Sequence, residues 1–273
     1  MANVPTKVYD RLSIGIKKFQ PILNTAKSRD VNESDTVIII TDMLSEIFGY
    51  DKYSEITSEF TVRSTYCDLA IKLDSKLAFL IEVKAVGLEL KDNFVKQAVD
   101  YAANQGIDFV VLTNGVLWRV YKISFTKPID QELVFEFDFL SLSHKNSDDI
   151  ERLSLLSKEG WLKSFLYEYH SQKQALSKFF LSALILSDSI TDVIKRELRK
   201  ISPDVKVTSE QIRDVIQLEV LKREVMEGDK ADEAKKKINK VFNKISKSKN
   251  TKQTLSETVE DKEVVKYDDD KNV

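Results

Sequence analysis

A single segment, residues 66–101, reads YCDLAIKLDSKLAFLIEVKAVGLELKDNFVKQAVDY. Apolar and polar residues alternate over residues 67–73, and a second apolar run over residues 77–84 carries charge only at its far end. The break between the two runs, residues 74–76, is Asp-Ser-Lys. Two β-rich runs separated by turn-prone residues predict a β-hairpin.

The register of this hairpin determines which charges meet. If Leu73 faces Leu77 across a three-residue loop, Asp68 lies opposite Glu82. Side chains alternate faces along a strand, so Glu82 and Lys84 share a face and Asp68 joins them. A slip of one residue would send Asp68 to the apolar face, so burial is expected to fix the register.

Three charged groups at one end of an otherwise apolar hairpin need a physical reason. Two nearby carboxylates raise each other's pKa unless a cation lies between them. Mg²⁺ suits such a pair, because it binds through one or two carboxylates and keeps several waters. The alternative is a solvated strand end with a surface ion pair between Glu82 and Lys84, which would contribute little to stability.

A helix is predicted directly after the hairpin, over residues 90–105, with an apolar stripe and a stop at Gly106. Gln97 and Tyr101 are four residues apart and share one face of it. The order Asp68, then Glu82-Val83-Lys84, then Gln97-x-x-x-Tyr101 resembles the PD-(D/E)xK nuclease superfamily. More narrowly, it resembles the N-terminal nuclease domain of type I restriction enzyme R subunits.

The resemblance implies a metal-dependent DNA endonuclease that hydrolyses phosphodiester bonds with Mg²⁺, or Mn²⁺ as a substitute. It implies metal binding by Asp68, Glu82 and the main-chain carbonyl of Val83. Lys84 would activate water or stabilise charge on the phosphate. The remaining implied catalytic residues, which orient the substrate or the lysine, are Gln97 and Tyr101. Cys67 stands where the superfamily often has a proline.

Glu33 is a further candidate at the metal site. Asn32 is a plausible N-cap, and a helix is predicted from Glu33 to about residue 48. The resemblance implies an additional metal-site glutamate on this first helix. A carboxylate at a helix start is also favoured by the helix dipole alone, and that alternative stays open.

Contacts to nucleic acid are expected from Arg63, Lys91 and Lys96. The chain has a formal net charge of -2 with 32% charged residues, so it has no strongly basic body. This charge balance argues against tight non-specific DNA binding but allows local basic patches. The sequence does not distinguish DNA from RNA.

The fold class expected is α/β: a restriction-endonuclease-like core of a mixed central sheet flanked by helices, in the order α-β-β-β-α-β-β, followed by an α-helical C-terminal region. Four parts are predicted: an N-terminal helical lead-in (1–30), the nuclease domain (31–145), a helical appendage (146–227) and a charged, disordered tail (228–273). In the appendage, helical periodicity predicts helices over residues 148–163, 171–200 and 208–226, the last opened by a capping box. The tail's low hydrophobicity and blocks of like charge predict disorder or a fraying helix.

The cysteine content, the apolar runs and the absence of one motif bear on where the protein acts and with which partners. One cysteine, no signal peptide and no long apolar run predict a cytoplasmic protein without a membrane partner. The chain has no GxxxxGK[ST] motif, so it does not resemble the motor half of a restriction enzyme. We therefore expect a subunit of a larger restriction or defence complex, or a homo-oligomer formed through the helical C-terminal region.

A second function remains open. The chain could be a catalytically silent nucleic-acid-binding or regulatory subunit that keeps the nuclease fold, since a fold does not dictate a function. The mild acidity and the missing motor favour this alternative. The buried charged set disfavours it, because a scaffold alone has no reason to bury Asp68, Glu82 and Lys84.

Overall fold

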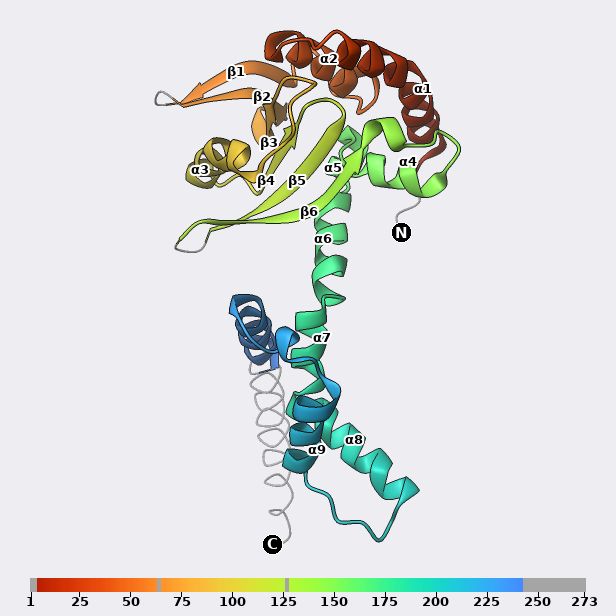
Figure 1. Ribbon diagram of the computed structural model, residues 1–273, viewed down its shortest axis with the longest axis vertical. Coiled ribbons are helices and arrows are strands. Elements are labelled where there is room, and N and C mark those ends of the chain that lie inside the picture. The colour runs from red at the N-terminus through yellow and green to blue at the C-terminus, as the bar shows by residue number, and fades with distance from the viewer. Residues whose placement is uncertain (1–3, 63–64, 126–127, 243–273) are drawn as a thin grey trace, which may run out of the picture. The chain divides into compact units, whose positions relative to one another are not determined.

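Figure 1 shows the computed structural model of the chain, which describes residues 4–62, 65–125 and 128–242. The side chains of residues 59–62, 65–66 and 97 are outside this description. The chain divides into two compact units, Met1–His170 (unit 1) and Ser171–Val273 (unit 2). The boundaries predicted at 30/31 and 145/146 lie within unit 1.

Unit 1 is a mixed α/β structure. It begins with two helices and three strands, continues through one further helix to three more strands, and ends in short helices. The elements are α1 (Thr6–Ser28), α2 (Glu33–Glu46), β1 (Ile56–Val62), β2 (Thr65–Leu73), β3 (Lys76–Val83), η1 (Asp92–Val95), α3 (Lys96–Gln105), β4 (Phe109–Thr113), β5 (Leu117–Ser124), β6 (Asp130–Asp138), η2 (Phe139–Ser141), α4 (Ser147–Ser154), α5 (Lys158–Leu162) and α6 (Phe165–Ala175), which runs into unit 2.

The six strands form one sheet in the order β1-β2-β3-β4-β5-β6. β3 and β4 are parallel, and every other neighbouring pair is antiparallel. The parallel pair requires a crossover, which η1 and α3 supply. The prediction of a mixed sheet flanked by helices is therefore confirmed, with β6 added at an edge.

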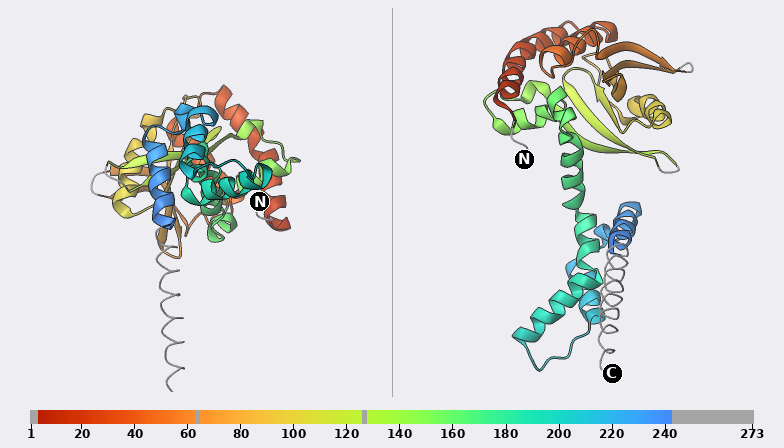
Figure 2. Two further views of the ribbon diagram at one scale, coloured as in Figure 1. Left: turned by 90° about the horizontal axis from the view of Figure 1, so that it is seen from below. Right: turned by 180° about the vertical axis from the view of Figure 1, so that it is seen from behind.

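Helices cover both faces of the sheet (Figures 1 and 2). On one face, α1 and α2 pack against alternate strand residues such as Leu69, Ile71 and Ile81. On the other face, α3 packs against the residues between them, including Ala70 and Leu80. Burial on both faces explains why the strands around β3 and β4 are almost continuously apolar.

The β2–β3 hairpin has a shorter loop than the sequence predicts. Leu73 pairs with Lys76, and both loop residues, Asp74 and Ser75, have positive φ of 49° and 64°. The predicted three-residue loop with Leu73 facing Leu77 is therefore wrong. A two-residue loop with positive φ at both positions matches the strand twist better.

A β-bulge restores the predicted register further along the hairpin. The pairing shifts between Ile71 and Lys72, where Ile71 faces Phe79 but Lys72 faces Leu77. From Ile71 to Leu69, which faces Ile81, the pairing is the one that the sequence predicts. Asp68 is thereby carried to the end of β3 that holds Glu82, although the loop is different.

Local signals place the ends of the helices that flank the site. Asn32 caps α2, its side chain accepting a hydrogen bond from the backbone N–H of Asp35 at 2.9 Å. Gly106 ends α3 in the left-handed conformation with φ of 69°. Both ends agree with the sequence prediction, whereas the predicted start at Leu90 is too early, because η1 begins at Asp92.

Unit 2 is helical, as predicted, but its helices are shorter than the periodicity indicates. It contains α7 (Lys178–Ile185), α8 (Asp188–Ile201), α9 (Ser209–Val215), η3 (Ile216–Val220) and η4 (Arg223–Val225). Ser177 caps α7 through its side chain, and Ser187 is the N-cap of α8. Serine at an N-cap competes with continuation of the preceding helix, and this divides the predicted helix 171–200. The predicted capping box at Thr208 and Gln211 is present.

Of the two alternatives predicted for the tail, disorder or a fraying helix, disorder does not hold for its first part, because residues 229–242 are helical. Ala234 and Ile238 are buried in a cluster with Ala183 of α7, so spaced apolar residues among the lysines give this helix a packing face. The rest of the tail lies outside the described residues. Within the part of the chain that the structure describes, no helix is long and apolar enough to cross a membrane.

Candidate active site

The predicted site residues meet at the C-terminal end of β3. Glu82 is the penultimate residue of β3, and Lys84 follows the strand. Asp68 comes from the neighbouring strand β2, and Glu33 is the first residue of α2. Three separate elements therefore contribute charged side chains to one end of the sheet.

Lys84 is the centre of the contacts. Its Nζ donates hydrogen bonds to Glu82 Oε1 and to the main-chain oxygen of Val83, both at 2.8 Å. Glu33 Oε2 lies 3.5 Å from the same ammonium group. The Lys84 side chain is only 15% exposed, so this is not the solvated surface ion pair of the alternative interpretation.

Asp68 contacts the same strand through its backbone. Asp68 Oδ2 accepts a hydrogen bond of 2.7 Å from the N–H of Val83. This hydrogen bond holds the Asp68 carboxylate against Val83, the residue between Glu82 and Lys84. Asp68 thus binds the backbone N–H of Val83, while Lys84 links the carboxylate of Glu82 to the backbone oxygen of the same residue.

Burial sets the charge states of this group. Removal from water raises the pKa of Glu82 to about 7, assisted by the negative charge of Asp68 and opposed by the hydrogen bond from Lys84. Burial also raises the pKa of Asp68, against the lowering effect of the Val83 hydrogen bond and of Lys84. Burial alone would lower the pKa of Lys84, but its bond to Glu82 and the nearby carboxylates outweigh this and raise it. Lys84 is therefore a cation at neutral pH.

Cys67 lies beside the carboxylates. It is 1% exposed, and its Sγ donates to the main-chain oxygens of Ile81 and Leu69. Burial, together with the charges of Glu82 and Asp68, raises the pKa of the Cys67 thiol to about 12. The thiol is therefore neutral, and Cys67 acts as a core residue.

Of the other predicted residues, the structure describes Tyr101, Lys91 and Lys96 but not the side chains of Gln97 and Arg63. Tyr101 of α3 is 6% exposed and belongs to the apolar cluster that contains Cys67 and Leu80. Gln97 lies one turn earlier on α3, but its side chain is outside the described residues, as is Arg63. Lys91 and Lys96 are exposed, at the start of η1 and of α3.

Two residues that the sequence analysis missed support the site. Thr36 of α2 is fully buried, and its Oγ1 accepts a hydrogen bond of 3.2 Å from the N–H of Val86. The main-chain oxygen of Thr113, at the end of β4, accepts from the N–H of Lys84 at 2.8 Å. Both bonds hold the segment after β3. A threonine one turn before Ile40, on the buried face of a predicted helix, is the signal that would have identified Thr36.

The donor set suits an oxygen-preferring divalent cation. Among the described residues, no group of three or more His, Cys, Asp or Glu side chains is arranged to hold a metal ion. Asp68 and Glu82 are a pair, and the main-chain oxygen of Val83 is the third oxygen at the same place. Two carboxylates and a carbonyl fit Mg²⁺, which takes few protein ligands and retains water.

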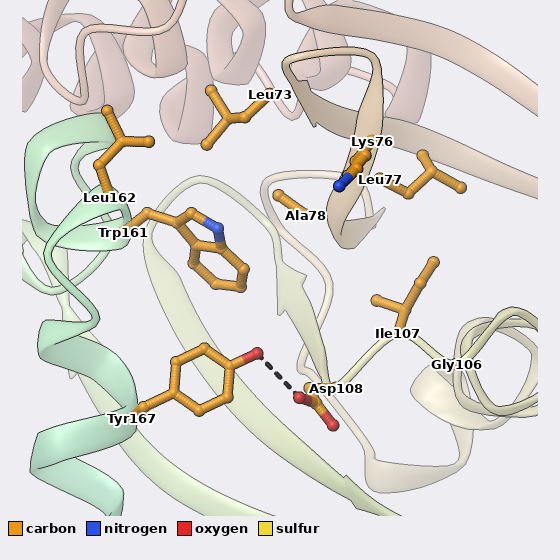
Figure 3. Close-up of a pocket in the computed structure, with 10 residues that line it drawn as sticks. All are labelled: Leu73, Lys76, Leu77, Ala78, Gly106, Ile107, Asp108, Trp161, Leu162 and Tyr167. Carbon is orange, nitrogen blue, oxygen red and sulfur yellow. Dashed lines mark hydrogen bonds between the residues drawn. The ribbon is translucent and has the colours of Figure 1, made fainter.

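A shallow pocket of about 350 Å³ opens at the other end of the hairpin (Figure 3). Its walls include Leu73, Trp161 and Tyr167, and Tyr167 donates a hydrogen bond of 2.8 Å to Asp108. Asp108 also forms an ion pair of 2.6 Å with Lys122. The acidic group of this pocket is thus already engaged, and the pocket lacks the paired carboxylates of the β3 end.

Comparison with known proteins agrees with the motif. Residues 39–134 match the family model of the type I restriction enzyme R protein N terminus. The matched range contains Asp68, Glu82, Lys84, Gln97 and Tyr101, whereas Glu33 precedes it. Searches of curated proteins and of solved structures gave no match. About a third of the chain, the part that forms most of the sheet and carries the motif, is therefore shown to resemble the N-terminal region of type I restriction enzyme R proteins.

Proposed function

We propose that the protein is a Mg²⁺-dependent nuclease that hydrolyses phosphodiester bonds in DNA. The observation that carries the proposal is the meeting of Asp68, Glu82 and Lys84 around the main chain of Val83. Taking two carboxylates and an ammonium group largely out of water at a strand end is costly, and mutual contacts often do not offset the whole of that cost. A metal-binding and phosphate-binding role accounts for keeping them.

Each residue has a distinct part in this proposal. Asp68, Glu82 and the Val83 carbonyl would hold the cation, which would supply Lewis-acid polarisation of the scissile phosphate. Lys84 keeps its proton at neutral pH, so it would stabilise negative charge on the phosphate oxygens rather than take a proton from water. Gln97 and Tyr101 stand one helical turn apart on α3 and would orient the substrate backbone or Lys84.

The architecture supports a restriction-endonuclease-like core. Its order α2-β1-β2-β3-α3-β4-β5 matches the expected α-β-β-β-α-β-β arrangement, and the candidate residues Asp68 and Glu82 lie on β2 and β3, where the motif expects them. The match over residues 39–134 covers this part of the chain. Type I R proteins act in restriction, so a role in restriction or defence within a larger complex is the biological setting that we propose.

Unit 2 would provide the contact with other chains. Several of its large apolar side chains are exposed, among them Leu176, Ile201 and Leu218 at 73%, 78% and 76%. Contiguous exposed apolar patches mark surfaces that bind another protein or a second copy, and these side chains are the candidates for such a patch. The proposal keeps two alternatives for the partner of this unit, a motor subunit or a second copy of this chain.

The test is cleavage of plasmid, linear and single-stranded DNA in Mg²⁺ or Mn²⁺, with wild type, Asp68→Asn and Lys84→Met in parallel. The proposal expects metal-dependent strand breaks by wild type, none by Asp68→Asn and strongly reduced cleavage by Lys84→Met. Cleavage that persists in both variants would contradict it. DNA binding that depends on salt, needs no divalent ion and survives Asp68→Asn would instead support a silent binding subunit.

A further inference from the structure

The ammonium group of Lys84 is bonded to two of the three oxygens assigned to the cation. It donates to Glu82 Oε1 and to the Val83 main-chain oxygen at 2.8 Å each. These are ordinary hydrogen-bond lengths for a cation that satisfies carboxylate and carbonyl oxygens. The positive charge of Lys84 therefore compensates part of the negative charge of the carboxylates without a metal ion.

We propose that Lys84 is a resident cation that a divalent ion must displace, and that Glu33 receives the displaced ammonium group. The proposal rests on the proposed function, because it assumes that Glu82 and Val83 bind the metal. A divalent ion on these oxygens would place a second positive centre next to the ammonium group, and like charges at such short range repel strongly in a partly buried site.

Among the described residues, Glu33 is the ion-pair partner of Lys84 that is not assigned to the cation. Glu33 Oε2 is already 3.5 Å from Nζ, and the Glu33 side chain is 47% exposed, so it lies at the open side of the site. The Glu82 side chain, in contrast, is 11% exposed. A shift from Glu82 to Glu33 therefore moves the ammonium group outward, toward the side from which a phosphate would approach.

The role of Glu33 as an acceptor for Lys84 differs from that of a metal ligand. As a ligand, Glu33 would stabilise the bound ion directly, whether or not Lys84 is present. As the acceptor, it would help the ion only by providing a partner for the displaced ammonium group. The two roles therefore predict different results when Lys84 is absent, and a double-mutant cycle separates them.

The experiment is calorimetric titration of Mn²⁺ into the full chain without DNA. The variants are Lys84→Met, Glu33→Gln, the double variant and Glu82→Gln. Lys76→Met serves as the control, because Lys76 lies at the opposite end of the same strand and is exposed. Methionine keeps the length of the lysine side chain and removes its charge.

We expect Lys84→Met to bind Mn²⁺ at least about tenfold more tightly than wild type, because the competing cation is gone. Lys76→Met should leave the affinity unchanged. Glu33→Gln should weaken binding roughly three- to tenfold in wild type but by less than about twofold when Lys84 is already methionine. Wild-type binding too weak to measure, together with measurable binding by Lys84→Met, would also support the displacement.

Two results would overturn the proposal while leaving the metal site intact. One is measurable binding by both proteins with an affinity of Lys84→Met equal to or weaker than that of wild type. The other is a Glu33→Gln effect of equal size with and without Lys84, which would make Glu33 a ligand. Loss of binding in Glu82→Gln shows that the ion sits on these carboxylates. Unchanged binding in Glu82→Gln, or no binding by wild type and by Lys84→Met, would overturn the proposed metal site itself, and the displacement with it.

Discussion

The carboxylate of Asp68 accepts a hydrogen bond of 2.7 Å from the backbone N–H of Val83. The bond joins β2 to the end of β3, between Glu82 and Lys84. Asp68 therefore has a structural partner as well as a proposed metal. Any test of its chemistry has to separate the two roles.

Asparagine and alanine at position 68 should separate them. Asp68→Asn keeps an oxygen acceptor for Val83, so its free energy of unfolding should be at least that of wild type at pH 8. Asp68→Ala leaves the buried Val83 N–H without this acceptor and should lose about 1–3 kcal/mol. Urea unfolding of both variants measures the difference. Equal stabilities would show that the hydrogen bond contributes nothing.

The raised pKa of Glu82 predicts a dependence of stability on pH. The unfolded chain loses the Glu82 proton near the ordinary value of 4.5, and the folded protein holds it to about 7. Between these values the folded state binds more protons, so this group's contribution to stability is full below pH 4.5 and is lost as the pH rises through 7.

Glu82→Gln removes this titration and keeps an oxygen near Lys84. The difference in free energy of unfolding between Glu82→Gln and wild type should increase by about 3 kcal/mol, in favour of the variant, from pH 4.5 to pH 8. Urea unfolding at several pH values without divalent ions checks it. A difference that is constant with pH would mean that Glu82 is not held neutral by burial.

Removing the charge of Lys84 should impair cleavage and leave the fold intact. Loss of one group that stabilises transition-state charge reduces kcat by roughly 10²–10³, and Lys84→Met is expected in this range. Lys76→Met is the matched control and should cleave like wild type. Single-turnover cleavage at saturating Mn²⁺ is the measurement, and a wild-type rate for Lys84→Met would remove Lys84 from the chemistry.

Thr36 is expected to stabilise the segment that follows the site. Thr36→Val keeps the shape but leaves the buried N–H of Val86 without its acceptor, which should cost about 1–3 kcal/mol. Thr41→Val is the control, because Thr41 Oγ1 bonds only within α2, to Val37. Urea unfolding should show a smaller loss for the control. Equal losses would assign the effect to the helix and not to the contact with Val86.

The apolar periodicity around Asp68 and Glu82 was sufficient to predict the hairpin, the order of the elements and the end of the sheet where the charges meet. The loop was wrong, since two residues with positive φ, Asp74 and Ser75, replace the expected three. The bulge beside Lys72 offsets that error. The alternation of apolar and polar residues along one strand does not show where a bulge shifts its pairing with the next strand.

The contacts of the site were less predictable than its residues. The sequence placed Glu33 only as a candidate, because 51 positions separate it from Lys84 and the way in which α2 packs on the sheet brings them together. Thr36 was missed for the same reason. In unit 2, Ser177 and Ser187 read as ordinary polar positions of one long helix, but each is an N-cap. The sequence alone does not show at which of these serines one helix ends and the next begins, because that depends on how the helices pack.

Mn²⁺ titration by calorimetry, on wild type, Asp68→Asn and Asp74→Asn, tests the central claim most directly. Asp74 lies at the turn of the same hairpin, where its positive φ suits asparagine, so this variant controls for the loss of one carboxylate. We predict one Mn²⁺ per chain for wild type and for Asp74→Asn, and no binding for Asp68→Asn. Binding by Asp68→Asn with the wild-type affinity would contradict a metal site at the end of β3.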